Sequence, residues 1–181
     1  MSFVFKKLHI PGPILVESKA FFDERGFFTE LFKGSDFVQN GIPMSFVQDN
    51  FSRSKRGVIR GLHYQLPPKA QGKLVRVLKG RGLDIAVDIR RASETFLKYV
   101  AIELSEDNNL ALFIPEGFAH DFMAFTDDTF LLYKCTNEYS PEHERGIRYD
   151  DPDINIDWGI VEPLVAKRDA DFPYAKNAEV F

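Results

Sequence analysis

Residues 60–77, RGLHYQLPPKAQGKLVRV, predict a strand, a turn and a second strand. Side chains alternate between the two faces of a strand, so Lys73 shares a face with Val75 and Val77. The first strand carries His63. A lysine buried among apolar side chains must be paired, or its pKa falls and it loses its charge. An inward lysine with a histidine nearby therefore indicates a chemical use for this part of the β-structure.

Strand-like runs recur along the rest of the chain. In residues 82–90, GLDIAVDIR, every second residue from Leu83 to Ile89 is apolar, which is the period of a half-buried strand. Gly, Pro, Asn or Asp separates most of the runs, as turns require. The predicted strands are 13–18, 26–32, 45–52, 58–65, 73–80, 82–90, 98–105, 110–115, 120–126 and 129–136.

So many closely spaced strands predict an all-β fold, a jelly-roll or β-barrel with a few short helices. Ser35 is a candidate N-cap for one helical turn that Asn40 and Gly41 would close, and the segment after Trp158 has room for one or two more turns. Neither a repeat nor a linker divides residues 1–181, so we expect a single domain. A barrel of this size can hold a small ligand in its mouth.

The composition narrows the classes of function. The 181-residue chain is 44% hydrophobic, contains 18 Phe and has a net charge of −4, which argues against a general nucleic-acid binder. The single cysteine, Cys135, cannot form an internal disulfide, and this favours a reducing compartment. The N-terminal apolar run is too short for a secretory signal, and no stretch approaches the ~20 apolar residues of a membrane helix. We expect a soluble, cytoplasmic protein with no membrane partner.

The histidines do not form a metal motif. They are His9, His63, His120 and His143. None are two residues apart, so the His-x-His pair that many metal-binding barrels use is missing. Because a zinc site needs three or four protein ligands, we expect no metal.

Without a metal, a histidine and a lysine in one cavity suggest proton transfer. Each residue alone also has a structural interpretation. His63 would be a strand histidine bonded to a backbone carbonyl, Lys73 an edge-strand lysine that discourages aggregation, and Tyr133 a packed core residue. Only their combination favours a catalytic interpretation.

Arginines near these residues indicate an anionic ligand. Arg25 and Glu30 lie five residues apart, and Arg60 precedes His63. Strict alternation would send Arg60 and His63 to opposite faces, but Gly61 is a candidate position for a bulge that re-aims one of them. Inward guanidinium groups suit a diphosphate, which they bind in a bidentate fork. The alternative is a set of surface salt bridges, and we assign residues 53–56, RSKR, to a solvated loop.

Taken together, the longer motifs resemble those of the dTDP-4-dehydrorhamnose 3,5-epimerase family. The matching stretches are FFDERGFFTELF (21–32), FVQDNFSRSKRGVIRGLHYQ (46–65), QGKLVRVLKGRGLDIAVDIRRASETF (71–96), LFIPEGFAH (112–120), LLYKCTNEYSPEHERGI (131–147) and DDPDINIDW (150–158). The resemblance implies a cupin-type jelly-roll, a homodimer, no cofactor and a 4-keto-6-deoxy sugar nucleotide as substrate. It also implies that the N-terminal segment of one subunit reaches the site of its partner.

The resemblance also implies residue roles. His63 would be the general base, Lys73 the group that stabilises an enolate, Tyr133 the acid on the opposite face of the sugar and Asp169 the partner that orients His63. The implied substrate-binding residues are Phe21, Arg25, Glu30, Gln48, Asn50, Arg60, His120 and Tyr139.

The chain departs from the family pattern at several positions. Residues 166–169 read Ala-Lys-Arg-Asp where the family usually has Ser-x-Lys-Asp, so the alignment of Asp169 rests on the spacing to Pro173. Asp121 and Leu97 replace usual glycines, and Gly159 replaces a usual proline. On a regular strand, Asp121 would face away from a ligand that His120 faces, although a bend there would bring it into contact.

Three alternatives stay open from the sequence. A sister enzyme that epimerises only C3 or only C5 would use the same residues. A metal-dependent barrel enzyme is disfavoured by the missing His-x-His pair. A non-catalytic sugar-nucleotide binder would be expected to lack His63, Lys73 or Tyr133, and all three are present.

Overall fold

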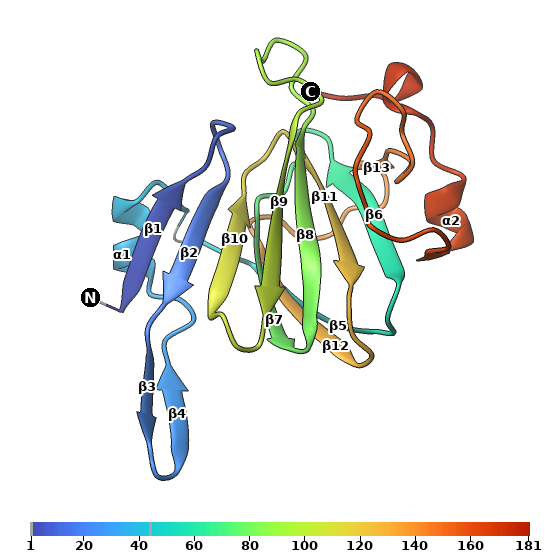
Figure 1. Cartoon of the computed structure of the whole chain (residues 1–181). Helices are drawn as coiled ribbons and strands as arrows, with labels where there is room; N and C mark the ends of the chain where they lie inside the picture. Colours follow the sequence, from blue (N-terminus) through green and yellow to red (C-terminus); the bar gives the residue numbers. More distant parts are fainter. Residues whose placement is uncertain (1, 44) are drawn as a thin grey trace.

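The computed structural model describes residues 2–43 and 45–181, and two large β-sheets that face each other dominate it (Figure 1). The first sheet has the strand order β1-β2-β10-β7-β12-β5. Its strands span Phe3–Lys7 (β1), Ile14–Ser18 (β2), Leu110–Ile114 (β10), Lys73–Lys79 (β7), Thr129–Cys135 (β12) and Gln48–Ser54 (β5). Strand β7 is hydrogen-bonded on both sides, so the interpretation of Lys73 as an edge-strand lysine is wrong.

The second sheet has the order β13-β6-β11-β8-β9, and the short β14 pairs in parallel with β6. Its strands span Glu144–Gly146 (β13), Val58–Gln65 (β6), Phe118–Ala124 (β11), Arg81–Asp88 (β8), Tyr99–Ser105 (β9) and Leu164–Val165 (β14). The predicted all-β jelly-roll is confirmed, and its two sheets stay open at their edges, so it is not a closed barrel.

The remaining elements lie around these sheets. The hairpin of β3 (Ala20–Asp23) and β4 (Gly26–Thr29) projects away from the body of the molecule (Figure 1). The helices are α1 (Gly34–Gln39), α2 (Lys167–Ala170) and the 3₁₀ turn η1 (Ala175–Asn177). None of the helices in the described residues is long and apolar enough to cross a membrane.

Apolar side chains cover both faces of the two sheets. Val75, Val77 and Phe122 belong to the cluster between the sheets, while Phe37 of α1 belongs to a cluster on the outside of the first sheet. A third cluster, which includes Ala175 of the C-terminal segment, covers the outside of the second sheet. Residues that face away from the first cluster are therefore buried as well.

This double coverage corrects the expectation of a half-buried strand at residues 82–90. The polar positions Asp84 and Asp88 are both 0% exposed. Asp88 is paired with Arg90, whose Nη2 lies 2.7 Å from its carboxylate, and Asp84 Oδ1 lies 2.7 Å from His120 Nε2. Buried polar groups are tolerated when they are hydrogen-bonded or paired in this way, which is why an alternating pattern did not mark a solvent-facing side.

Two local predictions near the N-terminus need correction. The helix predicted around Ser35 exists, but Lys33 occupies the N-cap position and Ser35 lies inside the first turn. Asn40 and Gly41 do close the helix, because the Asn40 N–H donates to the Phe37 carbonyl at 3.0 Å and the Gly41 N–H donates to the Val38 carbonyl at 3.1 Å. Strand β1, an edge strand of the first sheet, was not predicted from the sequence.

Candidate active site

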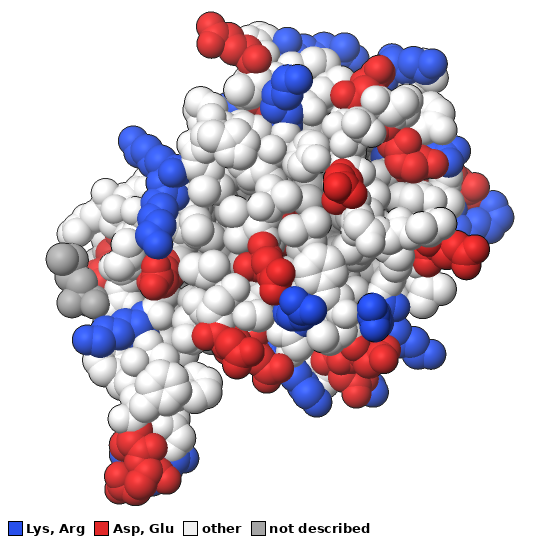
Figure 2. Space-filling model, viewed as in Figure 1, with Lys and Arg blue, Asp and Glu red and all other residues white. Residues whose placement is uncertain are grey.

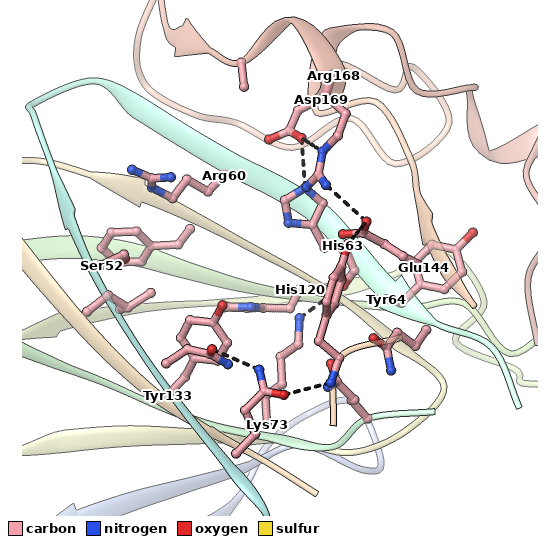
Figure 3. A pocket seen from close by; sticks show the side chains of 18 residues that line it. Ser52, Arg60, His63, Tyr64, Lys73, His120, Tyr133, Glu144, Arg168 and Asp169 are labelled. Atoms are coloured by element: carbon pink, nitrogen blue, oxygen red, sulfur yellow. Dashed lines mark hydrogen bonds and ion pairs between the residues drawn. The ribbon is translucent and has the colours of Figure 1, made fainter. Parts of the chain in front are cut away.

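A cavity of about 540 Å³ opens between the two sheets beside α2. A small-molecule site of this kind usually has a volume of roughly 300–1,000 Å³. Its lining residues are Gln48, Asn50, Ser52, Arg60, His63, Tyr64, Gln65, Gln71, Lys73, His120, Phe122, Leu131, Tyr133, Tyr139, Glu144, Ala166, Arg168 and Asp169. The structure thus brings together all four predicted catalytic residues, with side chains from both sheets and from α2 (Figure 3).

A bulge in β6 places Arg60 and His63 on the same face. His120 of β11 is opposite His63, whereas Phe122 is opposite Arg60, so two residues of β6 stand against one of β11. Gly61 is one of the two, with φ of +151°. A Cβ atom there would come within 2.6 Å of the His120 carbonyl oxygen. The predicted bulge is confirmed, and glycine is required at its centre.

His63 is oriented by a carboxylate. Its Nε2 lies 2.9 Å from Asp169 Oδ1, and its side chain is 23% exposed. This contact places the proton on Nε2 and leaves Nδ1 as the basic nitrogen. Burial alone would raise the pKa of Asp169, but the hydrogen bond from His63 and the charge of Arg168 lower it overall. Asp169 is therefore an ionised partner for the imidazole at neutral pH.

Lys73 lies at the inner end of the cavity and is only 8% exposed. Its Nζ donates one long hydrogen bond, 3.4 Å, to the backbone carbonyl of His63, and it forms no ion pair with any described residue. Burial lowers the pKa of Lys73, and the nearby Cys135 and Asp84 offset part of this shift. The amine is thus held in the cavity with hydrogen-bonding capacity left for a ligand oxygen.

Tyr133 approaches from the first sheet, with its ring centroid 5.9 Å from Lys73 Nζ and 6.2 Å from that of His120. Burial raises the pKa of Tyr133, the nearby Cys135 raises it further and Arg60 lowers it somewhat. The phenol therefore keeps its proton at neutral pH. This is the state that a proton donor needs.

His120 forms a second pair, with Asp84. The distance from His120 Nε2 to Asp84 Oδ1 is 2.7 Å, and both side chains are almost fully buried. Burial lowers the pKa of His120, and the charges of Lys73 and His63 lower it further. Burial also raises the pKa of Asp84, with Lys73 offsetting part of the shift. His120 is therefore a neutral hydrogen-bonding group.

Polar side chains of β5 and the loop before β13 form the outer wall. Gln48 donates to Asn50 Oδ1 at 3.0 Å and accepts from the backbone N–H of Tyr139 at 2.7 Å. Arg60 donates to Ser54 Oγ at 3.0 Å and still lines the cavity. These contacts order the groups that the resemblance assigns to substrate binding.

Phe21, Arg25 and Glu30 lie apart from this cavity. They belong to the projecting hairpin or follow it, and they are absent from the lining. The Arg25 side chain is 83% exposed and pairs only with Asp23 of the same hairpin. In the single chain these three predicted substrate-binding residues therefore do not belong to the site.

Glu144 and Arg168 also line the cavity, although neither was predicted from the sequence. Arg168 Nη1 lies 3.1 Å from Glu144, and its Nη2 lies 3.3 Å from His63 Nε2. Glu144 also accepts from the Tyr139 hydroxyl at 2.8 Å. Arg168 directly precedes Asp169, and this adjacency was the one signal that could have identified it.

The other departures have local explanations. Leu97, in place of a usual glycine, has φ of +62°, a conformation that costs a side chain of this type on the order of 1 kcal/mol or more. Gly159 has φ of +62°, which proline cannot adopt. Asp121 is fully buried and does not line the cavity, whereas His120 does, so the expected opposite orientation of the two is confirmed.

These features define the class of the site. A base held by a carboxylate, a buried amine and a protonated phenol surround one cavity, which suits proton transfer at carbon next to a carbonyl group. Within residues 2–43 and 45–181, no three His, Cys, Asp or Glu side chains are grouped so that they could hold a metal ion. The fold and site are those of a jelly-roll with acid–base machinery.

The comparisons with known proteins identify the family. The profile described as dTDP-4-dehydrorhamnose 3,5-epimerase matches residues 7–177. A dTDP-4-dehydrorhamnose 3,5-epimerase of Shigella flexneri is 48% identical over 176 residues, which cover 97% of each protein. The crystal structure of the Sulfolobus tokodaii enzyme of the same name has a TM-score of 0.94 at 50% identity and covers 100% of this chain and 99% of its own.

A further solved structure carries a ligand. The dTDP-6-deoxy-D-glucose-3,5-epimerase of Legionella pneumophila, in complex with dTDP-4-keto-L-rhamnose, has a TM-score of 0.93 at 43% identity and covers 97% of this chain and 94% of its own. The chain belongs to the dTDP-4-dehydrorhamnose 3,5-epimerase family.

Proposed function

We propose that the chain epimerises C3 and C5 of dTDP-4-dehydro-6-deoxyglucose to give dTDP-4-dehydrorhamnose. The observation that carries this function is the convergence of His63, Lys73 and Tyr133 on one cavity in a chain of this family. A binder without catalysis has no need for a buried amine beside an oriented base. We therefore propose catalysis of epimerisation as well as binding of the dTDP-sugar.

Each catalytic residue has a role that its surroundings support. The C4 ketone of the substrate acidifies the protons at C3 and C5, and His63 Nδ1 removes one of them. Lys73 stabilises the negative charge that develops on the C4 oxygen. Tyr133 returns a proton from the opposite face and inverts the centre, while Asp169 holds His63 in its tautomer and stabilises the imidazolium. The reaction uses no cofactor.

The remaining lining residues bind the substrate. Arg60 contacts the diphosphate through its guanidinium group, which suits phosphate oxygens. Gln48, Asn50 and Tyr139 form the nucleotide end of the cavity, and His120 donates or accepts a hydrogen bond at the sugar without changing its charge.

The proposal also includes a homodimer in which the hairpin of one subunit completes the cavity of the other. Four hairpin phenylalanines, Phe21, Phe22, Phe27 and Phe28, are 46%, 77%, 60% and 66% exposed. Figure 2 shows a hairpin stem without charge and a charged, mostly acidic tip, where Arg25 pairs with Asp23. An exposed apolar segment of this kind marks an interaction site. Phe21, Arg25 and Glu30 would then act in the cavity of the partner.

This form of the dimer differs from simple strand addition. Strand β2, residues 14–18, pairs with β1 and β10 of its own sheet, so it has no free edge for a partner's strand. The apolar run at 13–18 is therefore not free to extend a partner's sheet. The hairpin of β3 and β4 remains available, because it pairs only with itself.

A mixing experiment tests the dimer and the shared site together. Light scattering should give about twice the 20.8 kDa of one chain. Arg25→Ala and His63→Ala variants should each be nearly inactive. Random exchange of subunits gives half mixed dimers with one intact site of two, so about a quarter of wild-type activity should return. A monomer, or no recovery after proven exchange, contradicts the shared site.

The function itself is tested by incubating the chain with dTDP-4-dehydro-6-deoxyglucose in D2O and following the products by NMR. Deuterium should enter C3 and C5, and both centres should be inverted. Inversion at one centre alone would identify a sister epimerase. Binding without any exchange would identify a non-catalytic sugar-nucleotide protein, and either result contradicts the proposal.

A further inference from the structure

Asp121 is a buried carboxyl group that the proposed reaction does not use. It follows His120 on β11, is 0% exposed and is not among the residues that line the cavity. Its Oδ1 accepts the backbone N–H of Phe122 at 2.6 Å, and its Oδ2 has no hydrogen-bond partner among residues 2–43 and 45–181. A buried polar atom that lacks a partner is costly, so its retention calls for a physical reason.

The position of Asp121 is the point where β11 faces the bulge of β6. Between the pairs His120–His63 and Phe122–Arg60, Asp121 alone stands against Gly61 and Leu62. A Cβ atom on Gly61 would be 2.7 Å from Asp121 Cγ, so the carboxyl group lies directly on the bulge. The absence of a side chain at Gly61 thus leaves the space that the Asp121 carboxyl group occupies.

The carboxyl group supplies one hydrogen-bond acceptor, Oδ1, to β11 at the point where its pairing with β6 is interrupted. A bulge leaves backbone groups of the ladder without their normal partners. The N–H of Phe122 is bonded to Asp121, and the N–H groups of Phe122 and Arg60 both lower the pKa of this carboxyl from nearby. Glycine, which the family resemblance leads one to expect here, would supply no such acceptor. This chain has therefore added a side-chain acceptor at its bulge.

The charges around Asp121 favour an uncharged carboxyl group. Burial raises its pKa well above the usual range, and the neighbouring Asp169 and Asp84 raise it further. Lys73 is the cation that interacts with it. A neutral acid keeps one carbonyl oxygen as an acceptor, so the contact with Phe122 does not need a charge.

We propose that Asp121 is a positioning residue: its acceptor oxygen fixes the N–H of Phe122, which stands opposite Arg60, its carboxyl group packs on Gly61, and the β6 bulge held in this way keeps Arg60 and His63 on one face of the cavity. The inference rests on the proposed function, because it assigns catalysis to His63 and diphosphate binding to Arg60. A shift of about 1 Å in a catalytic group can reduce the rate ~100-fold. Loss of the Asp121 acceptor should loosen the bulge and thus reduce turnover and diphosphate affinity together.

Two substitutions of similar shape separate the acceptor from the rest of the side chain. Asp121→Asn keeps an acceptor oxygen, and Asp121→Leu has the same branching without one. We expect Asp121→Asn to retain kcat/KM within about twofold, with an unchanged pH profile. Asp121→Leu should lose ~10- to 100-fold in kcat/KM, and calorimetry should show weaker dTDP binding. If Asp121→Leu does not fold, Asp121→Ala replaces it with the same expectation.

A matched control separates positioning from general destabilisation. Asp151 is a second buried carboxyl group that is absent from the cavity lining and accepts backbone N–H groups of Asp153, Ile154 and Ala175. Asp151→Leu should lower the melting temperature and leave kcat/KM nearly unchanged in the folded protein.

Two results would overturn the role of Asp121. One is a folded Asp121→Leu or Asp121→Ala variant with kcat/KM and dTDP affinity within twofold of wild type. The other is a shift of the pH profile in Asp121→Asn by more than about half a unit, because the residue would then act through charge. An inactive wild-type chain, or a fully active His63→Ala variant, would instead overturn the proposed function.

Discussion

The molecule contains two histidine–carboxylate pairs that differ mainly in their exposure. His63 with Asp169 lies where the second sheet meets α2, and the imidazole is 23% exposed. His120 with Asp84 lies inside the fold, where the imidazole is 7% exposed and the carboxylate 0%. The contact distances are similar, 2.9 and 2.7 Å.

Because the two pairs differ in exposure, the pKa values of their members are shifted differently. Hydrogen bonds and the charge of Arg168 outweigh burial at Asp169 and lower its pKa, so it can balance a charged His63. At the inner pair burial dominates, and it raises the pKa of Asp84 while it lowers that of His120. The outer pair therefore keeps an ionised carboxylate beside the imidazole, as the proposed proton transfer requires, whereas the inner pair forms a fixed hydrogen bond.

The largest expected effect comes from removing the outer imidazole. His63→Ala should reduce kcat by roughly 10²–10⁴-fold, the usual contribution of a general base, with little change in substrate affinity. His120→Ala should cost about tenfold, mostly in KM, because it removes a neutral hydrogen-bonding group. Steady-state kinetics of both variants would measure the contrast.

The comparison fails if the two variants behave alike. A His63→Ala variant with more than about a tenth of wild-type kcat would not have lost a general base. If His120→Ala lost more kcat than His63→Ala, His120 would be the general base, although burial lowers its pKa.

The next effect separates proton removal from inversion. Tyr133 stands beside His120, with a ring-centroid distance of 6.2 Å, and not beside His63. In Tyr133→Phe the base still removes a proton, and reprotonation from the His63 face restores the starting configuration. In D2O this variant should exchange hydrogen for deuterium faster than it forms epimer. Equal losses of exchange and inversion, measured by NMR, would return Tyr133 to a packing role.

Much of this site was predictable from the sequence, because period and spacing are local properties. The alternation around Lys73 correctly placed it inward, and Gly61 correctly marked the bulge that brings Arg60 and His63 together. Asp169 was expected only through the resemblance, and the structure places it 2.9 Å from His63 across 106 residues of sequence. Such a pairing depends on how α2 folds back, which no local pattern records.

The site residues that were not predicted depend on tertiary structure. Sequence alternation shows which residues share a face, but it does not show whether the other face is covered. Asp84 was assigned to the polar side of a half-buried strand, yet the inner sheet face buries it with His120. Glu144 and Arg168 were not predicted because they belong to the site only through contacts between distant parts of the chain. Arg168 contacts both Glu144 and His63.

The smallest effect is a contrast in the pH dependence of stability between the two carboxylates. The pKa of Asp169 is lowered in the folded chain from 3.8, so its stabilisation is complete above that value and is lost as the pH falls through the folded pKa. The pKa of Asp84 is raised, so the folded chain loses stability as the pH rises from 3.8 toward the folded pKa. Replacement by Asn removes either dependence.

Thermal unfolding at pH 3.5, 5 and 7 would therefore give opposite pH slopes for the stability contributions of the two carboxylates. A shift of one pKa unit corresponds to ~1.4 kcal/mol. The melting temperature of wild type minus that of Asp169→Asn should shrink toward low pH. The corresponding difference for Asp84→Asn should shrink toward neutral pH. Slopes of the same sign would mean that burial does not distinguish the two pairs, and the assignment of a proton-transferring outer pair and a fixed inner pair would lose its electrostatic basis.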